Sequence, residues 1–316
     1  MRKIGLALMV VVLLAGSAFA SPMHLTMATG GVAGTYFPLG GVMAQVISER
    51  SGVVNITAQA TGASVENVNL VDMGEADLAL VQNDIAYFAF TGSGIPSFEG
   101  NQITNFRAIA NLYPEVLHVV AQADLGVESM ADLLGKRIAV GAPGSGNEAN
   151  CRQIFGFYGL SYTNTSPFFI SFAESVNHFK DRLIDSFVFT TGAPNPGIMD
   201  IVTLHEVTFV PIDGEIRDQI IEQYPYFTKA VIPAGTYMGQ TEDVETIAVQ
   251  AILIVREDLS DDIVYAMTRA MFENLDDIAL GHAMGRMIQL ETALDGLTVP
   301  LHPGAERFYR AVGLIN

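Results

Sequence analysis

Short apolar runs alternate with amphipathic stretches along most of the chain. The first unit has an apolar run at 24–28, a glycine-rich loop at 30–36 and an amphipathic stretch that reaches about Arg50. The apolar face predicted for this helix follows the i, i+3, i+4, i+7, i+8 spacing and consists of Leu39, Val42, Met43, Val46 and Ile47. Such an alternation is typical of an α/β fold with mostly parallel strands.

The same pattern continues to residue 121. The strands predicted in this part are 54–60, 77–82, 106–110 and 117–121. Ser64 is predicted to be the N-cap of a helix at 65–73, because its hydroxyl can accept a bond from the first turn. The chain is predicted to cross into a second lobe at residues 112–115, which include a proline.

A second lobe follows with the same order of elements. Ser129 is predicted to cap a short helix, and a second glycine-rich loop at 141–148 opens another. The further elements predicted here are strands at 137–140, 168–171, 186–189 and 207–212 and a helix at 173–181. The apolar segment 247–255 is predicted to carry the chain back to the first lobe, and Ser260 to cap a helix near the carboxyl end. With 316 residues, two domains are expected. Lobe I is predicted to be 21–115 plus 253–316, and lobe II 116–252.

The amino terminus has the pattern of an export signal. Arg2 and Lys3 precede the apolar run Ile4–Gly16, and Ala18-Phe19-Ala20 follows with the small residues that signal peptidase recognises. The apolar run is shorter than the ~20 residues that a membrane-spanning helix needs. Residues 1–20 are therefore predicted to be removed after Ala20, which places the mature protein in the periplasm.

The charge balance narrows the choice of partners. The formal net charge is -18 at pH 7, and it becomes -20 when Arg2 and Lys3 are removed with the signal. Nucleic acid is not expected as a partner, because phosphate backbones are bound by clustered Lys and Arg. The single cysteine, Cys151, excludes an intramolecular disulfide and a multi-cysteine metal site.

Three strand-loop-helix junctions carry the candidate chemistry, at 30–36, 62–67 and 141–148. Each places small and hydroxyl side chains before a helix, whose free N–H groups and dipole attract an anion. One such loop alone is more often a turn that needs glycine. Three of them facing one another across a cleft predict a small anionic ligand with a carboxylate.

The sequence does not contain the motifs that nucleotide binding, catalysis or metal binding would require. The loop 141–148 has no Lys followed by Ser or Thr, so it is not a P-loop, and no nucleotide cofactor is expected. No catalytic or metal-binding motif is present, and an exported hydrolase using Ser64 or Ser145 has no His and acid placed to activate either serine. Arg152 is open to two interpretations, a ligand contact or a structural ion pair. A purely adhesive protein would not require the three junctions.

Six ordered segments resemble the TAXI family, the extracytoplasmic solute-binding receptors of TRAP transporters. They are GGVAGTYFPLGG (30–41), ATGASVENVNLVDMGEADLALVQNDIA (60–86), FRAIANLYPEVLHVV (106–120), DLLGKRIAVGAPGSGNE (132–148), SFAESVNHFKDRLIDSF (171–187) and GAPNP (192–196). The resemblance implies a periplasmic-binding-protein fold of type II, with two lobes, a ligand cleft between them and two crossover segments. It also implies delivery of glutamate, glutamine, 2-oxoglutarate or a similar acid to a permease with fused subunits, driven by an ion gradient.

The resemblance also implies a set of ligand contacts. Those of the first lobe are Gly34, Thr35, Tyr36, Ser64, Gln82 and Asn83. Those of the second lobe are Ser145, Gly146 and Asn147, with Glu174 and Asn195 as further candidates. Glu174 is expected to accept a bond from a ligand ammonium, which would favour an amino acid over a keto acid.

The sequence thus predicts a non-enzymatic receptor without cofactor or metal, which binds a small organic acid or amino acid. The alternative is a periplasmic sensor that uses the same cleft and reports to a membrane kinase. Gene neighbourhood would separate these two functions.

Overall fold

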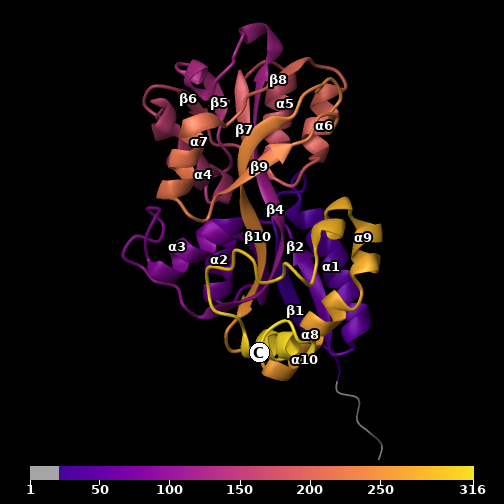
Figure 1. Cartoon of the computed structure of the whole chain (residues 1–316). Coiled ribbons are helices and arrows are strands. Elements are labelled where there is room, and N and C mark those ends of the chain that lie inside the picture. Colours follow the sequence, from indigo (N-terminus) through magenta and orange to yellow (C-terminus); the bar gives the residue numbers. More distant parts are fainter. Residues whose placement is uncertain (1–20) are drawn as a thin grey trace, which may run out of the picture.

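A computed structural model describes residues 21–316 as two lobes joined by two long strands. These strands are β4 (Phe106–Gln122) and β10 (Val244–Arg256), which run through both lobes in Figure 1. The predicted export signal at 1–20 lies outside the described residues. In the part of the chain that is described, no helix has the length and hydropathy needed to cross a membrane.

The first lobe contains the amino-terminal units and the carboxyl-terminal helices. Its strands and their following helices are β1 (Met23–Ala28), α1 (Tyr36–Ser51), β2 (Val54–Gln59), α2 (Ser64–Asp72), β3 (Leu78–Gln82) and α3 (Asn83–Thr91). The carboxyl-terminal helices are α8 (Asp261–Phe272), α9 (Leu275–Gly281) and α10 (Pro303–Ala311). The strand order is β2-β1-β3-β10-β4, with β1 parallel to both neighbours and β10 antiparallel to β3. Ser260 caps α8 as predicted, because its side chain accepts a bond from the Ile263 N–H.

The second lobe repeats the strand-helix arrangement around β4 and β10. Its strands are β5 (Arg137–Ala139), β6 (Ser166–Phe168), β7 (Ser186–Thr191), β8 (Val207–Phe209) and β9 (Thr228–Ile232). Its helices are α4 (Gly146–Phe155), α5 (Phe172–Lys180), α6 (Pro196–Val202) and α7 (Gly214–Gln223). The order β4-β7-β5-β6 is extended by β8 on β4 and β9 on β10. Ser129 begins a 3-10 turn with a capping box rather than an α-helix.

The two strands predicted at 106–110 and 117–121 are one continuous strand, and the predicted crossing point at 112–115 lies within it. Pairing of β4 with β7 starts at Val116, so at Pro114 the strand is paired only with β10. A proline there removes no bond from the β7 ladder, and the strand can pass through it. On β10, Ala251–Val255 pair with β3 of the first lobe, and Val244–Ala248 pair with β9 of the second. The lobe boundaries predicted from the sequence stay predictions.

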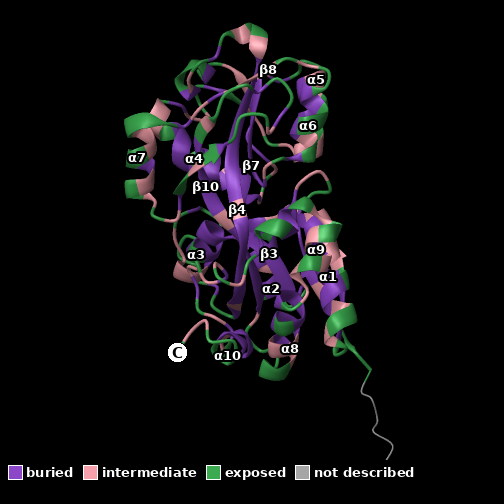
Figure 2. Cartoon of the chain, turned by 45° about the vertical axis from the view of Figure 1, so that its right-hand side comes forward, coloured by how far each residue is buried: buried purple, intermediate pink, exposed green. Residues whose placement is uncertain are grey.

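Both lobes have apolar cores on the two faces of the sheet. One core of the first lobe lies between the sheet and α1, α8 and α10, and the other lies under α2 and α3. Figure 2 shows that the central strands are buried through both lobes, while the exposed residues lie on the outer helices and loops. Rigid cores of this kind hold the loops that follow the strands in fixed positions.

Candidate functional site

A cavity of about 330 Å³ lies between the two lobes. Its volume falls at the lower end of the range for small-molecule pockets, roughly 300 to 1,000 Å³. The three glycine-rich junctions all contribute to its wall, with Gly31–Tyr36 and Ala60–Ser64 from the first lobe and Ala142 and Ser145–Asn147 from the second. The cavity therefore lies at the carboxyl ends of strands, where ligands bind in open α/β sheets.

Helix N-termini surround the cavity. α1 begins at Tyr36, α2 at Ser64 and α4 at Gly146, each directly after the junction loop. The first-turn N–H groups of a helix have no partner within it, and they carry a partial positive charge. Ala63, just before α2, has a φ of 80°, a left-handed conformation that is strained for a residue with a side chain. This strain is located at the cavity wall, where function can explain its presence.

Hydrogen bonds join the lobes across the cavity. The hydroxyls of Thr35 on the first lobe and Thr191 on the second are 3.0 Å apart. The N–H groups of Val65 and Glu66 at the start of α2 donate to the carbonyl of Gly144 in the second lobe, at 3.2 and 3.3 Å. The structure is therefore a closed form, in which the two lobes touch on both sides of the cavity.

Gln82 of the first lobe lies directly against Gly146 of the second. A Cβ at Gly146 would overlap the side-chain amide of Gln82, so the amide could keep this position only beside a glycine. The Oε1 of Gln82 is buried without a hydrogen-bond partner. A buried acceptor that lacks a donor is costly, and one in a cavity wall is satisfied when a ligand supplies the donor.

Glu115 on β4 is the one carboxylate among the residues that line the cavity. It is 3% exposed and accepts hydrogen bonds from the hydroxyls of Tyr36, at 2.8 Å, and Tyr113, at 3.4 Å. Burial raises its pKa to about 8, which the hydrogen bond from Tyr36 only partly offsets. The lining residues within 21–316 include no Lys, Arg or His. The sequence analysis did not identify Glu115, although its position in an apolar segment beside Val116 was a signal that it could be buried.

Asn147 lies at the cavity wall, but its side chain stabilises the second lobe. Its Nδ2 donates to the carbonyls of Val140 and Val188, both at 2.8 Å, and its Oδ1 accepts from the Thr190 N–H. Asn67 has the same arrangement in the first lobe, where its Nδ2 donates to the carbonyls of Thr29 and Leu80 at 2.6 and 2.7 Å. Each asparagine therefore links two neighbouring strands, and only the backbone of Asn147 remains for a ligand.

The two predicted serines differ in their local roles. Ser145 is the N-cap of α4, accepting from the Glu148 N–H at 3.1 Å and donating to the Ala142 carbonyl at 2.7 Å. Ser64 is not an N-cap, because it is the first residue of α2, and its hydroxyl oxygen accepts from the Gln82 N–H at 3.1 Å. The Ser64 hydroxyl proton is therefore available to a ligand, while that of Ser145 is already used.

Three predicted contacts do not line this cavity. Glu174 is exposed, and its carboxylate completes a capping box with Ser171 at the start of α5. Asn195 caps α6 and donates to Thr191 at 3.2 Å, so it reaches the cavity only through that threonine. Asn83 follows Gln82 but bonds to Gly296 instead. The S-x-x-E spacing of Ser171 and Glu174 is a capping-box signature that could have predicted the role of Glu174.

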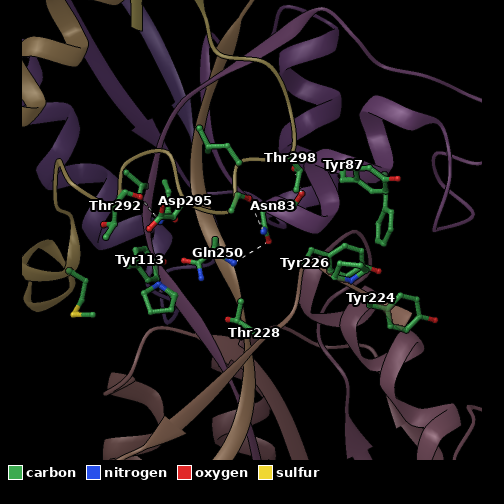
Figure 3. Close-up of a pocket in the computed structure, with 18 of the residues that line it drawn as sticks. Asn83, Tyr87, Tyr113, Tyr224, Tyr226, Thr228, Gln250, Thr292, Asp295 and Thr298 are labelled. Carbon is green, nitrogen blue, oxygen red and sulfur yellow. Dashed lines mark hydrogen bonds between the residues drawn. The ribbon is translucent and has the colours of Figure 1, made fainter. Parts of the chain in front are cut away.

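A second cavity of about 830 Å³ lies beside the crossing strands and shares no lining residue with the first. Figure 3 shows its labelled side chains, with Tyr224 and Tyr226 from the second lobe, Tyr87 from the first, and Asn83 beside Gln250. No strand-loop-helix junction with glycine opens onto it. Although it is larger, the converging helix N-termini that surround the first cavity are not found among its described lining residues.

The remaining candidates have structural roles. Arg152 pairs with Glu148 at 2.6 Å and lies over the ring of Tyr162, which supports the ion-pair interpretation. Cys151 is buried, and burial raises the pKa of its thiol well above the ordinary value. Within the described residues, no three side chains of the metal-ligating types gather at one point.

This architecture, two α/β lobes joined by two strands with a cavity between them, is the type II fold of periplasmic binding proteins. The chain belongs to the NMT1-like family, whose model matches residues 27–313. The fold predicted from the sequence is thereby confirmed.

Solved structures share the fold at low sequence identity. A protein from Bordetella bronchiseptica RB50 is 16% identical with a TM-score of 0.54, over 91% of this chain and 83% of that one. A protein named as an L-cystine ABC transporter from Listeria monocytogenes is 12% identical with a TM-score of 0.51, over 86% of this chain and 98% of that one. The binding-protein component of an ABC phosphonate transporter from Pseudomonas aeruginosa is 12% identical with a TM-score of 0.50, over 87% of this chain and 83% of that one. At these identities, the comparison shows the fold alone.

Proposed function

We propose that this protein is a non-enzymatic solute receptor, which binds one small molecule between its lobes and delivers it to a membrane transporter. The observation that carries this proposal is the enclosed cavity at three helix N-termini, with the lobes hydrogen-bonded across it. Such a cavity is enclosed only when the lobes close, so a ligand bound in it stabilises the closed form. The cavity wall holds no histidine, and neither Ser64 nor Ser145 has a base beside it.

The helix N-termini are suited to the carboxylate end of the ligand. The starts of α1 and α4 face the cavity from opposite lobes, through Tyr36 and Gly146. Their free N–H groups can donate to carboxylate oxygens, and the helix dipoles favour negative charge there. A carboxylate bound between the two lobes would hold them together, which supports an acid as ligand.

The acceptors in the cavity wall are suited to an ammonium group. Glu115 and the unpartnered Oε1 of Gln82 are acceptors, and the described lining residues offer no cationic side chain. The second carboxylate of a dicarboxylate would find no cationic side chain among the described lining residues and no ammonium of its own to compensate its charge. We therefore propose an amino acid, of which glutamate and glutamine are the first candidates, rather than 2-oxoglutarate. Glu115 takes the role that the sequence analysis gave to Glu174.

The transporter we propose is of the TRAP type, with fused permease subunits, and the protein would act in the periplasm. The six segments that resemble TAXI receptors support this choice, together with the export signal predicted at 1–20. Two structural neighbours bear the names of ABC systems, but 12% identity does not carry a transporter type from one chain to another.

A thermal-shift screen tests the proposed function. The protein, residues 21–316, is unfolded and refolded to remove bound ligand and then heated with L-glutamate, L-glutamine, 2-oxoglutarate or succinate. At 100 times its dissociation constant, a ligand of the native state adds about 2.7 kcal/mol to the free energy of unfolding. We expect a rise in the melting temperature with an amino acid and none with succinate. No rise with any of these compounds would contradict a receptor for small acids.

A further inference from the structure

A buried carboxyl group links the two lobes outside the ligand cavity. Asp84, near the start of α3 in the first lobe, is completely buried. Its Oδ2 accepts a hydrogen bond of 2.7 Å from the Nδ2 of Asn150, which lies on α4 in the second lobe and is also completely buried. The two residues meet only because the lobes are closed.

The pair of Asp84 and Asn150 lacks one hydrogen-bond donor when Asp84 is ionised. The Oδ1 of Asp84 and the Oδ1 of Asn150 are both buried, and neither has a hydrogen-bond partner. Both atoms are acceptors when the aspartate is ionised, and two acceptors cannot satisfy one another. A proton on the Asp84 Oδ1 would turn that atom into a donor and give the Asn150 Oδ1 an available partner.

The surroundings of Asp84 favour the neutral acid. The ionisable groups that face it are Glu115 on β4 and Tyr226 between α7 and β9, and neither can supply a positive charge. No cation contributes to its pKa, which burial raises to about 7 although the hydrogen bond from Asn150 opposes this rise. From α4, which carries Asn150, the neighbouring Arg152 is paired with Glu148.

Closure of the lobes creates this environment. Ala149, next to Asn150 on α4, packs into the apolar core of the first lobe with Val65 and Ile85. When the lobes separate, α4 leaves α3 and water reaches Asp84. An aspartate in water has a pKa near its ordinary value of roughly 3.9 and is ionised at neutral pH.

We propose that Asp84 and Asn150 form a proton-operated latch, in which closure of the lobes takes up one proton at Asp84 and opening releases it. The proposal depends on the proposed function only in requiring that the lobes open and close. The ligand class and the transporter do not enter it. It follows that a rise in pH favours the open form of the ligand-free protein.

The direction of this pH effect follows from proton linkage. The closed form binds the Asp84 proton more tightly than the open form, so between the two pKa values the closed fraction falls as pH rises. The closing equilibrium changes by up to tenfold for each pH unit in that interval, from about pH 4 to about pH 7. Below it both forms are protonated, and above it both are ionised, so the equilibrium is then independent of Asp84.

Small-angle X-ray scattering of the ligand-free protein tests the latch. The radius of gyration is measured at about pH 5 and about pH 8, across the interval in which linkage operates. We expect a larger radius at the higher pH for the wild type. Asp84→Asn, whose amide can donate without a titrating proton, is expected to lose most of this pH response. Asp72→Asn removes an exposed acid of the first lobe and should respond like the wild type.

A further variant keeps the result unambiguous. Asn150→Asp places a second acid in the latch and should open the lobes at a lower pH, which tests the proposal even if Asp84→Asn does not fold. A wild-type radius that is independent of pH would overturn the latch, as would an unchanged response in Asp84→Asn. Because no ligand is added, failure of the latch is separate from failure of the thermal-shift screen.

Discussion

Glu115 is the residue that decides between amino acids and other acids in the proposed site. It is buried between the hydroxyls of Tyr36 and Tyr113, which hold its carboxyl group in one position. With a pKa of about 8 in the empty cavity, it is mostly neutral at pH 7. A ligand ammonium stabilises the ionised form, so binding of an amino acid releases this proton.

Replacement of Glu115 by Gln should weaken the binding of an amino acid by tenfold or more, because a hydrogen bond to a charged group contributes about 1.5–3 kcal/mol. The ratio of wild-type to Glu115→Gln affinity should increase as pH rises from 6 towards 8, since ionisation of Glu115 then requires less work. Calorimetric titration with L-glutamate or L-glutamine measures both values. Asp84 is present in both proteins, so the ratio isolates Glu115. A ratio that does not change with pH would contradict the role of Glu115.

At the residue scale, the sequence predicted the small and hydroxyl residues of the cavity but not its buried acid. Glycine and hydroxyl side chains directly before a helix form a pattern that can be read from neighbouring residues alone. This pattern identified Gly34, Thr35, Tyr36 and Ser64. Burial of Glu115 has no local cause. It depends on the tertiary fold, which brings Tyr36 at the start of α1 to a residue of β4 that lies 79 positions away in the sequence. Asn83 and Glu174 were assigned by their positions in a family pattern, and their hydrogen bonds lie elsewhere.

The helix α4 connects ligand binding with closure. Gly146 at its start approaches Gln82, Asn147 fixes its position on β5 and β7, and Asn150 bonds to Asp84 one turn later. All three contacts lie on the first turns of one rigid element. A displacement of α4 therefore acts on the cavity and on the contact between the lobes at the same time.

Replacement of Gly146 by Ala should weaken ligand binding severalfold, because its Cβ would overlap the Gln82 amide and displace this side chain from its position in the cavity wall. Folding should be little affected, since the overlap is between the lobes and not within a core. Gly156→Ala at the other end of α4 is the matched control, because a Cβ there meets no atom within 4 Å. Melting temperatures with and without ligand measure both effects. Ligand binding of wild-type strength in Gly146→Ala would show that this contact is not needed for binding.

At the element scale, most strands and helices followed from hydrophobic periodicity, and the exceptions have a common reason. The strand β4 was predicted in two pieces because Tyr113-Pro114 resembles a turn when only neighbours in sequence are considered. Its continuity depends on β10, whose pairing spans the proline. Long-range pairing of this kind is invisible to a local pattern.

At the scale of the whole molecule, the strands β4 and β10 connect the two lobes, and ligand binding between the lobes would change their relative position. β4 and β10 are the segments at which the sheet pairing passes from one lobe to the other, close to Glu115 on one strand and Ala248–Ala251 on the other. A ligand that binds both lobes shifts the population towards the closed form. A transporter that recognises only this form would receive only loaded receptor.

Competition among ligands tests this account most directly. Ligand-free protein is incubated with an equimolar mixture of the common L-amino acids, 2-oxoglutarate and small dicarboxylates, separated by gel filtration and denatured, and the released compounds are identified by mass spectrometry. We expect one amino acid at about one molecule per protein, because a single enclosed cavity offers one site, and a loss of this enrichment in Glu115→Gln. Retention of 2-oxoglutarate or another dicarboxylate in place of an amino acid, or enrichment that Glu115→Gln leaves unchanged, would contradict a cavity built around an ammonium and a carboxylate.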